Sequence, residues 1–432
     1  MAANKLLEWL NVYGGEDRVW YIKRLSGNDT LANHSHQAGP YIPRNFLFGV
    51  FPTLNRPDVK NPDARFELSV DSHAERRIVR AIWYNNRFHD TAAKRGRDEA
   101  RVTGFGGATS ALLDPESTGA LTIFAFAIGG TSDCHVWVCR DAVEEELVEE
   151  RVGPVDPGRW LVWPAAQAGR FAETPAMRTS CWLEDAEIPQ EWRLRFPTGV
   201  EIIRKVSELR DDTCLDPDQR LLRRRECEFE IFRSVEQAIE LPHILAGFTT
   251  IDAFLTRAQT VLQRRKARSG NSLELHARSI FLEEGLNEVT QFAHQPESEP
   301  GKKPDFLFPS TAAYRDASFP AGQLRMLAVK TTCRDRWRQI LNEADRIPTK
   351  HLLTLQEGVS EAQFAEMTNA GVRLVVPAGL TEKFPKSVQP SLQTLESFIG
   401  DVRGLECART SGPAVDTVAP TTQGTYADRT AA

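Results

Sequence analysis

The chain has 432 residues, which is long for a single hydrophobic core, so its length predicts two domains. Hydrophobic residues make up 41% of it and charged residues 26%, as in globular proteins, and no apolar run is long enough to suggest a membrane span. The net charge of −6 argues against a protein that coats nucleic acid indiscriminately, although basic residues are concentrated between positions 75 and 101. Since the start lacks a secretory signal, the sequence predicts a cytoplasmic protein.

The first 178 residues are predicted to be rich in β-strands. Short apolar and aromatic runs are separated by Gly, Pro and Asn turns, which is the pattern of strands joined by tight connections. The expected strands are 17–25, 40–43, 65–70, 80–86, 119–128, 134–139 and 158–165. Many short strands in one segment are typical of a barrel or pseudobarrel.

Helical spacing of apolar residues begins after residue 190. It predicts helices at 197–210, 227–245, 250–268 and 272–286, followed by strands of a mixed sheet at 306–308, 325–330, 351–355 and 372–377. The segment SCWLEDAEIPQEW interrupts both patterns. The expected organisation is a β-rich N-terminal domain (1–178), a linker (179–192), a C-terminal α/β domain (193–406) and a disordered tail (407–432) of small and polar residues.

The cysteines predict neither a disulfide framework nor a zinc site. They are odd in number and form no CxxC pairs, so reduced thiols are expected. The seven positions are Cys134, Cys139, Cys181, Cys214, Cys227, Cys333 and Cys407.

Two charged residues lie at the ends of predicted strands in the second domain. Asp305 in GKKPDFLFPS precedes one strand, and Lys330 in LRMLAVK ends the next. Metal-assisted phosphodiester cleavage needs carboxylates that hold Mg²⁺ and an ammonium group that orients the attacking water and stabilises charge on the phosphate. Pro-Asp occurs elsewhere in this chain and alone signals only a turn. The apolar strand after Asp305 and the AVK run favour a nuclease site.

The second carboxylate of such a site is not in its usual place. Restriction nucleases commonly carry it two residues before the lysine, where this chain has Ala328. A helix predicted from Asp335 onward offers Glu343, on the same side as Arg336 two turns earlier. The alternative is that Glu343 is a solvated acid of that helix.

Arg334, Asp335 and Arg336 form a charged triplet at the start of the same predicted helix. Arginine can bind guanine O6 and N7, and a carboxylate can accept from cytosine N4, so the triplet predicts readout of adjacent G·C pairs. The alternative is an ordinary charged helix start, in which Asp335 is favoured by the helix dipole.

These runs resemble the EcoRII family of restriction endonucleases. The likeness is carried by KKPDFLFPS, LRMLAVKTTCRDRWRQILNEADRI, HLLTLQEGVS and GVRLVVP, with YIKRLSGNDT, YIP, STGALT and LDPDQRLLRRR upstream. It extends over nearly the whole chain except the tail. The family in turn resembles PD-(D/E)XK nucleases in which the second acid has moved to the following helix.

The resemblance implies roles for the residues singled out above. Asp305 and Glu343 would be metal ligands, Lys330 the catalytic lysine, and the Arg-acid-Arg triplet would contact the C·G pairs of a CCNGG-type site. Glu274, on a preceding helix, occupies the place where this class often supplies a further acid near the metal. The alternative for Glu274 is a solvated helix residue.

For the N-terminal domain the resemblance implies a B3-like pseudobarrel that binds a second, effector copy of the recognition sequence. Two predicted loops, NHSHQAGPYIP and KRGRDEARVT, carry side chains suited to phosphates and G·C edges. The candidates are His36, Tyr41, Lys94, Arg95, Arg97, Glu99 and Arg101. Open alternatives are a metal pair of His34 with His36 and a core position for Tyr41. Ala100 departs from the basic residue expected in the family, which would remove a phosphate contact.

The leading hypothesis is a Mg²⁺-dependent type II restriction endonuclease that cuts double-stranded DNA at a CCWGG-like site. It would act as a homodimer, with a cognate methyltransferase as functional partner, and the resemblance implies autoinhibition by the N-terminal domain. A second hypothesis is a DNA-binding regulator with an inactive nuclease fold. A third, a nuclease for RNA or single strands, needs aromatic stacking platforms, and Trp337 is better explained as a core residue. Whether the central base pair is restricted to A·T stays open.

Overall fold

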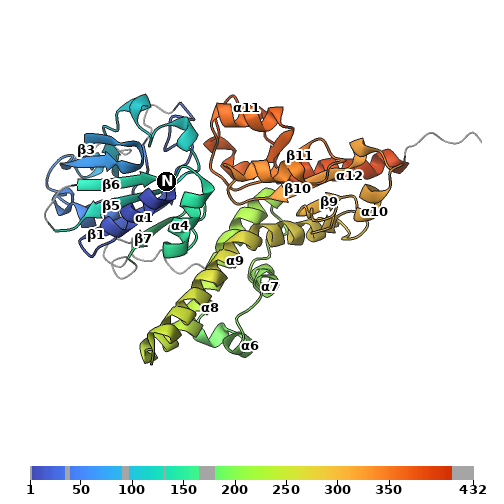
Figure 1. Cartoon of the computed structure of the whole chain (residues 1–432), viewed down its shortest axis with the longest axis horizontal. Coiled ribbons are helices and arrows are strands. Elements are labelled where there is room, and N and C mark those ends of the chain that lie inside the picture. The colour runs from blue at the N-terminus through green and yellow to red at the C-terminus, as the bar shows by residue number, and fades with distance from the viewer. Residues whose placement is uncertain (1, 35–38, 90–96, 130–132, 165–180, 411–432) are drawn as a thin grey trace, which may run out of the picture.

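The computed structural model describes residues 2–34, 39–89, 97–129, 133–164 and 181–410. They form two bodies that lie side by side, each built on its own β-sheet (Figure 1). Residues 2–164 are called the N-terminal part below, and residues 181–410 the C-terminal part. None of the helices in these described residues is long and apolar enough to cross a membrane. The predicted domain limits stay a prediction.

The N-terminal part contains a curled seven-stranded sheet in the order β4-β3-β2-β6-β5-β1-β7, antiparallel except for the parallel pair β2–β6. Its strands are β1 (Arg18–Arg24), β2 (Asp63–Val70), β3 (Glu75–Tyr84), β4 (Glu99–Thr103), β5 (Leu121–Ala127), β6 (Asp133–Val138) and β7 (Trp160–Trp163). Its helices are α1 (Ala2–Val12), α2 (Arg44–Val50), α3 (Asn86–His89) and α4 (Ala142–Val152). The predicted strands are confirmed except 40–43, where proline on both sides leaves a non-repetitive segment.

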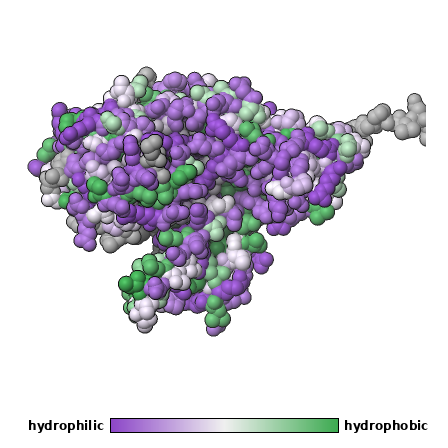
Figure 2. All heavy atoms as spheres, in the orientation of Figure 1, coloured by the Kyte–Doolittle hydropathy of each residue, from purple (hydrophilic) through white to green (hydrophobic). Residues whose placement is uncertain are grey.

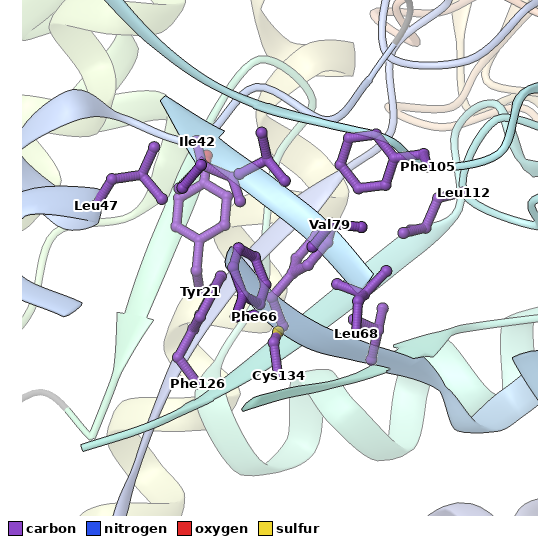
Figure 3. Packing of buried hydrophobic residues seen from close by; sticks show 14 of the residues in the cluster. Tyr21, Ile42, Leu47, Phe66, Leu68, Val79, Phe105, Leu112, Phe126 and Cys134 are labelled. Carbon is purple, nitrogen blue, oxygen red and sulfur yellow. The ribbon is translucent and has the colours of Figure 1, made fainter. Parts of the chain in front are cut away.

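Successive side chains of these strands enter two different clusters, because they point to opposite faces of the sheet. Tyr21 of β1 packs with Phe66 and Phe126 in the cluster that the curled sheet encloses (Figure 3). Trp20 and Ile22 face the other side, where α1 and α4 cover them. The sheet is therefore buried on both faces around β1, β5 and β6, whereas β2, β3 and β4 leave part of their outer face exposed.

The C-terminal part begins with helices and continues into a five-stranded sheet in the order β12-β11-β10-β9-β8. Its helices are α6 (Gln190–Leu194), α7 (Gly199–Leu209), α8 (Pro217–Ala246), α9 (Ile251–Glu283), α10 (Thr311–Arg315), α11 (Glu361–Asn369) and α12 (Leu395–Thr410). Its strands are β8 (Ala293–His294), β9 (Phe306–Phe308), β10 (Arg325–Val329), β11 (Lys350–Leu353) and β12 (Val372–Val375). The mixed sheet and its four predicted strands are confirmed.

Helices α8 and α9 form a long hairpin that projects away from both sheets (Figure 1). The prediction of separate helices at 250–268 and 272–286 is wrong, because α9 runs through Gly270 without a break. Glycine lowers helix propensity but keeps its N–H, and packing against α8 overrides that cost. One such contact is the 3.1 Å ion pair of Arg268 with Glu228.

Each face of the C-terminal sheet is also covered. Phe306 and Leu327 pack against α9 and α12 on one face. Leu307 and Ala328 face the opposite cluster, to which Trp337 contributes. Helix α12 continues to Thr410, past the predicted start of the tail, and residues 411–432 lie outside the described part of the chain.

Cys181 and Cys227 form a disulfide, so the prediction of reduced thiols is wrong for this pair. The bond joins the segment before α6 to α8 across a sequence separation of 46 residues. Spacing that long gives no signal in the sequence, because pairing depends on how the helices pack.

Candidate functional site

Asp305 and Lys330 meet at one edge of the C-terminal sheet. Asp305 directly precedes β9, and Lys330 directly follows β10, its antiparallel neighbour. Asp305 Oδ2 accepts a 2.7 Å hydrogen bond from the backbone N–H of Val329 and lies 3.5 Å from Lys330 Nζ. The structure thus brings the two side chains together, as the order of the strands predicted.

Glu343 approaches the same edge, but not from an α-helix. Residues Arg336–Asn342 form a short 3-10 helix, η7, and Glu343 follows its end with an extended backbone. The prediction that Arg336 and Glu343 share one side of an α-helix is therefore wrong. Lys350 explains the end of the helix, because its ammonium group donates to the carbonyls of Glu343 and Ala344.

The position of Glu343 accounts for the missing acid at Ala328. The usual acid would stand at position 328, on the face of β10 to which the side chain of Ala328 points. That face carries the apolar cluster containing Trp337, which anchors η7. Glu343 therefore arrives over the face on which the usual acid would stand, and Trp337 is a core residue, as expected.

Burial and neighbouring charge both disfavour ionised carboxylates in this cluster. The pKa of Glu343 is raised to about 7, first by burial and then by the charge of Asp305, against the opposing effect of Lys330. Burial also raises the pKa of Asp305, again opposed by Lys330. Glu343 is half-buried and its Oε2 is fully enclosed, so it is not the solvated helix acid of the alternative.

The two carboxylates fit a hard divalent cation. Glu343 Oε2 is buried and has no hydrogen-bond partner among the described residues. Within the same residues, no three His, Cys, Asp or Glu side chains are placed to hold a metal unaided. Mg²⁺ is usually held by one or two carboxylates, with water and phosphate oxygens as the other ligands. Asp305 and Glu343 suit that mode of binding.

Replacing Glu343 by Gln should stabilise the metal-free protein at pH 8 and have a much smaller effect at pH 5. The folded-state pKa of about 7 exceeds the ordinary value of about 4.3. The folded state therefore binds more protons between these pH values, and the free energy of unfolding of the unaltered protein falls as pH rises through this range. Glutamine does not ionise and avoids that loss.

The measurement is thermal denaturation in EDTA at both pH values. Glu8→Gln, at an exposed position in α1, is the matched control and should show no such difference between pH 5 and pH 8. A Glu343→Gln variant that melts below the unaltered protein at pH 8 would show that the carboxylate is not destabilised by its surroundings.

Glu274 lies on the buried side of α9, beside the same edge of the sheet. Its side chain is 9% exposed, and its Oε1 accepts hydrogen bonds of 2.6 Å from His294 Nε2 and 2.8 Å from Gln295 Nε2. The charge of Glu274 raises the pKa of Asp305, so the two carboxylates interact. The solvated alternative for Glu274 is wrong. Neither His294 nor Gln295 lies in a motif, so no sequence signal pointed to them.

Arg334 is engaged by the N-terminal part rather than exposed. Its guanidinium donates hydrogen bonds of 2.7 Å to the carbonyl of Cys139 and 2.8 Å to that of Arg140. Glu145 Oε1 lies 3.4 Å away, and the side chain of Arg334 is only 13% exposed.

The other members of the triplet are more accessible. Asp335 is the N-cap of η7 but makes no capping hydrogen bond, and its carboxylate lies 3.7 Å from Arg338. Arg336 opens η7 and is half-buried. The alternative of an ordinary charged helix start, with Asp335 favoured by the helix dipole, stays open.

Further contacts join the two parts of the molecule. Asp156 lies 2.7 Å from Arg268 and 3.5 Å from Arg225 of the helical hairpin. Burial alone would raise the pKa of Asp156, but the two arginines hold it down to about 2. Elsewhere the backbone N–H of Gly27 donates a 2.6 Å hydrogen bond to the carbonyl of Glu357.

A cleft of about 1270 Å³ in the N-terminal part gathers several effector candidates. Tyr41, Arg97, Glu99 and Arg101 line it. Tyr41 is 58% exposed, so the alternative of a core tyrosine is wrong. The remaining candidates lie outside the described residues, and with them the proposed histidine pair; they are His36, Lys94 and Arg95.

The segment predicted as the second DNA-binding loop includes an edge strand. Residues Glu99–Thr103 form β4, so Glu99 and Arg101 point to one face and Ala100 points to the core, where it is 6% exposed. Ala100 therefore does not mark a lost phosphate contact. The sequence signal for a strand was hidden by the charged residues on its outer face.

Two family models match the sequence. The one described as "EcoRII C terminal" matches residues 232–399, and the one described as "Restriction endonuclease EcoRII, N-terminal" matches residues 14–167. The type II restriction enzyme EcoRII of Escherichia coli is 44% identical over 403 residues, which cover 92% of this chain and 97% of that enzyme.

Solved structures resemble parts of the chain. Metal-depleted Ecl18kI in complex with uncleaved DNA is 18% identical, covers 52% of this chain and 85% of its own, and has a TM-score of 0.43. The B3 domain of the UbaLAI restriction endonuclease with cognate DNA is 20% identical, covers 37% of this chain and 98% of its own, and has a TM-score of 0.26.

Proposed function

The chain belongs to the EcoRII family of type II restriction endonucleases, and on that premise we propose that it cleaves double-stranded DNA at a CCWGG-like sequence by Mg²⁺-dependent hydrolysis. The cluster of Asp305, Lys330 and Glu343 carries the proposal. Its main support is the buried Oε2 of Glu343, an acceptor that no described residue satisfies. A buried oxygen of this kind is costly unless a cation or a proton occupies it.

In this proposal each charged residue of the cluster has one task. Asp305 and Glu343 hold Mg²⁺, with Glu274 as a further acid. Bound Mg²⁺ supplies positive charge that acidifies water and offsets charge on the phosphate. Lys330 orients the attacking water and stabilises the negative charge that develops during in-line displacement. Its 3.5 Å approach to Asp305 supports a position beside the metal.

Arg334, Asp335 and Arg336 are the proposed readers of the C·G pairs. A two-fold symmetric sequence suits a homodimer in which each copy cuts one strand. Exposed apolar side chains at the end of the α8–α9 hairpin support a surface for the second copy, and they appear as green spheres in Figure 2. They are Leu241, Ile244, Leu245, Ile251, Phe254 and Leu255. A methyltransferase that protects the same sequence is the implied functional partner.

We propose further that the N-terminal part is a B3-like effector module that inhibits the nuclease while the two parts are docked. The support is the engagement of Arg334, because the hydrogen bonds that would reach base edges are made instead to Cys139 and Arg140. The loop before the effector cleft also contacts the nuclease, since Asn33 Nδ2 donates a 2.9 Å hydrogen bond to the carbonyl of Lys383. Binding of effector DNA beside this loop can thus alter the contacts between the N-terminal and C-terminal parts.

Replacing Arg97 by Ala should weaken binding of the effector site by about 5–150-fold, the equivalent of one good base or phosphate contact of about 1–3 kcal/mol. Arg97 is exposed at the cleft and lies over the Tyr84 ring at 5.9 Å. Stimulation of cleavage by a second DNA site, titrated with an uncleavable duplex, is the measurement. Arg56→Ala, at an exposed arginine paired with Asp58 outside the cleft, is the control. Unchanged stimulation in Arg97→Ala would remove this residue from the effector site.

The specificity proposal is tested with duplexes that differ only in the central base pair. We expect cleavage with A·T or T·A at the centre and none with G·C or C·G. Cleavage of all four would relax the site to CCNGG. Specific binding of the duplex without any cleavage in Mg²⁺ would favour the alternative function, a regulator with an inactive nuclease fold.

A further inference from the structure

We infer that His294 and Gln295 are positioning residues that hold the Glu274 carboxylate beside the proposed metal site of Asp305 and Glu343, where its charge adds to the attraction for a divalent metal. The inference rests on the proposed metal-dependent function. Both side chains donate to the same oxygen, Glu274 Oε1, at 2.6 and 2.8 Å.

Gln295 touches both acids at once. Its side chain donates to Glu274, and its backbone N–H donates a 2.8 Å hydrogen bond to the carbonyl of Asp305. One residue thus fixes the distance between the carboxylate from α9 and the residue that precedes β9. His294 lies on β8 opposite Phe306, so its ring is also fixed by the sheet.

The backbone of Gln295 has a conformation that is unusual for a residue with a side chain. Its φ is 49°, in the left-handed region that favours glycine. Glycine is the more favourable residue for this backbone, so Gln295→Gly removes the side chain without adding backbone strain. Here the amide points to Glu274.

Glu274 needs hydrogen-bond donors because it is a buried acid close to a second acid. Glu274 is buried, and its charge acts unfavourably on Asp305. The two donors offset the cost of burying this polar side chain. Residues that orient metal ligands typically change metal affinity or activity about 10–100-fold when they are removed.

The decisive variant is Gln295→Gly. Glycine relieves the left-handed backbone and removes the amide, so a merely structural role for Gln295 predicts an unchanged metal affinity with an equal or higher Tm. Our inference predicts that the Kd for Mn²⁺, measured on the full chain by electron paramagnetic resonance, rises about 10–100-fold. The Mg²⁺ concentration for half-maximal cleavage should rise in parallel, while the rate at saturating Mg²⁺ changes far less. Ala74→Gly, at φ 54° in the N-terminal part, is the matched control.

His294 is tested by a pair of variants. His294→Leu removes the donor and should weaken Mn²⁺ binding, whereas His294→Gln places an amide near the same point and should restore most of it. An unchanged Mn²⁺ affinity in both Gln295→Gly and His294→Leu would overturn the inference, even if both cut poorly. Failure of the proposed function looks different, because the unaltered protein itself would then neither bind Mn²⁺ nor cleave in Mg²⁺.

Discussion

Lys330→Ala should cut duplex DNA at least 10²–10³-fold more slowly than the unaltered protein, roughly the cost of removing one charge-stabilising donor from an active site. Lys330 is the cation beside Asp305, at 3.5 Å, and alanine leaves the backbone hydrogen bond between Val329 and Asp305 in place. The loss should therefore fall on the chemical step. Single-turnover cleavage in saturating Mg²⁺ measures it, and binding of the same duplex in Ca²⁺ should change little.

Lys303→Ala is the matched control, because this lysine is exposed and only two residues before Asp305. It should cleave at the normal rate. If Lys330→Ala cut as fast as Lys303→Ala, the site at the edge of the C-terminal sheet would not be the catalytic one.

Gly27→Ala should raise cleavage of DNA with a single recognition site by about 5–150-fold. A Cβ at Gly27 would press against the carbonyl oxygen of Lys383, in the other part of the molecule. Overpacking of this kind costs about 1–3 kcal/mol, and here the cost falls mainly on the docked arrangement, because the other neighbour of the Cβ is the end of the Asn33 side chain. Gly27 is not in the left-handed region, so alanine adds no backbone strain. Once the parts separate, Arg334 is released from Cys139 and Arg140.

Single-site cleavage rates and small-angle scattering together test this prediction. Gly322→Ala is the control, because nothing lies within 4 Å of a Cβ there. Asp156→Asn, which weakens the ion pairs with Arg268 and Arg225, should act in the same direction as Gly27→Ala. A Gly27→Ala protein that opens but gains no single-site activity would contradict autoinhibition.

The sequence predicted the parts of the site that lie on regular strands. Asp305 and Lys330 were found because each adjoins an apolar run, and neighbouring strands bring their ends together. Glu343 was selected as a residue of an α-helix, but it follows a 3-10 helix. The stripe containing Trp337 indicated a buried helix, but nothing local showed that Lys350 would end it as a 3-10 turn.

Contacts between distant segments were the ones that the sequence did not reveal. His294 and Gln295 meet Glu274 only because β8 is added to the edge of the sheet beside α9. The disulfide of Cys181 with Cys227 likewise depends on how the helices pack. Neither involves a spacing or composition that differs from ordinary loops, so only the folded arrangement gives them meaning.

The same limit applies to regulation. Arg334 is a proposed DNA reader, and the sequence could not show that its guanidinium is hydrogen-bonded to the N-terminal part. Strand β4 was also not predicted from the sequence. Its outward residues Glu99 and Arg101 are charged, and only Ala100 and Val102 face the core. Burial on one face of an edge strand leaves a weak pattern.

The most direct test of the proposed activity is to incubate the full chain with a plasmid carrying several CCWGG sites and to sequence the ends that form. We predict double-strand cuts at those sites in Mg²⁺ and none in EDTA. Cuts that persist in EDTA, or cuts unrelated to CCWGG, would contradict the proposal that Asp305, Lys330 and Glu343 form a metal-dependent, sequence-specific nuclease site.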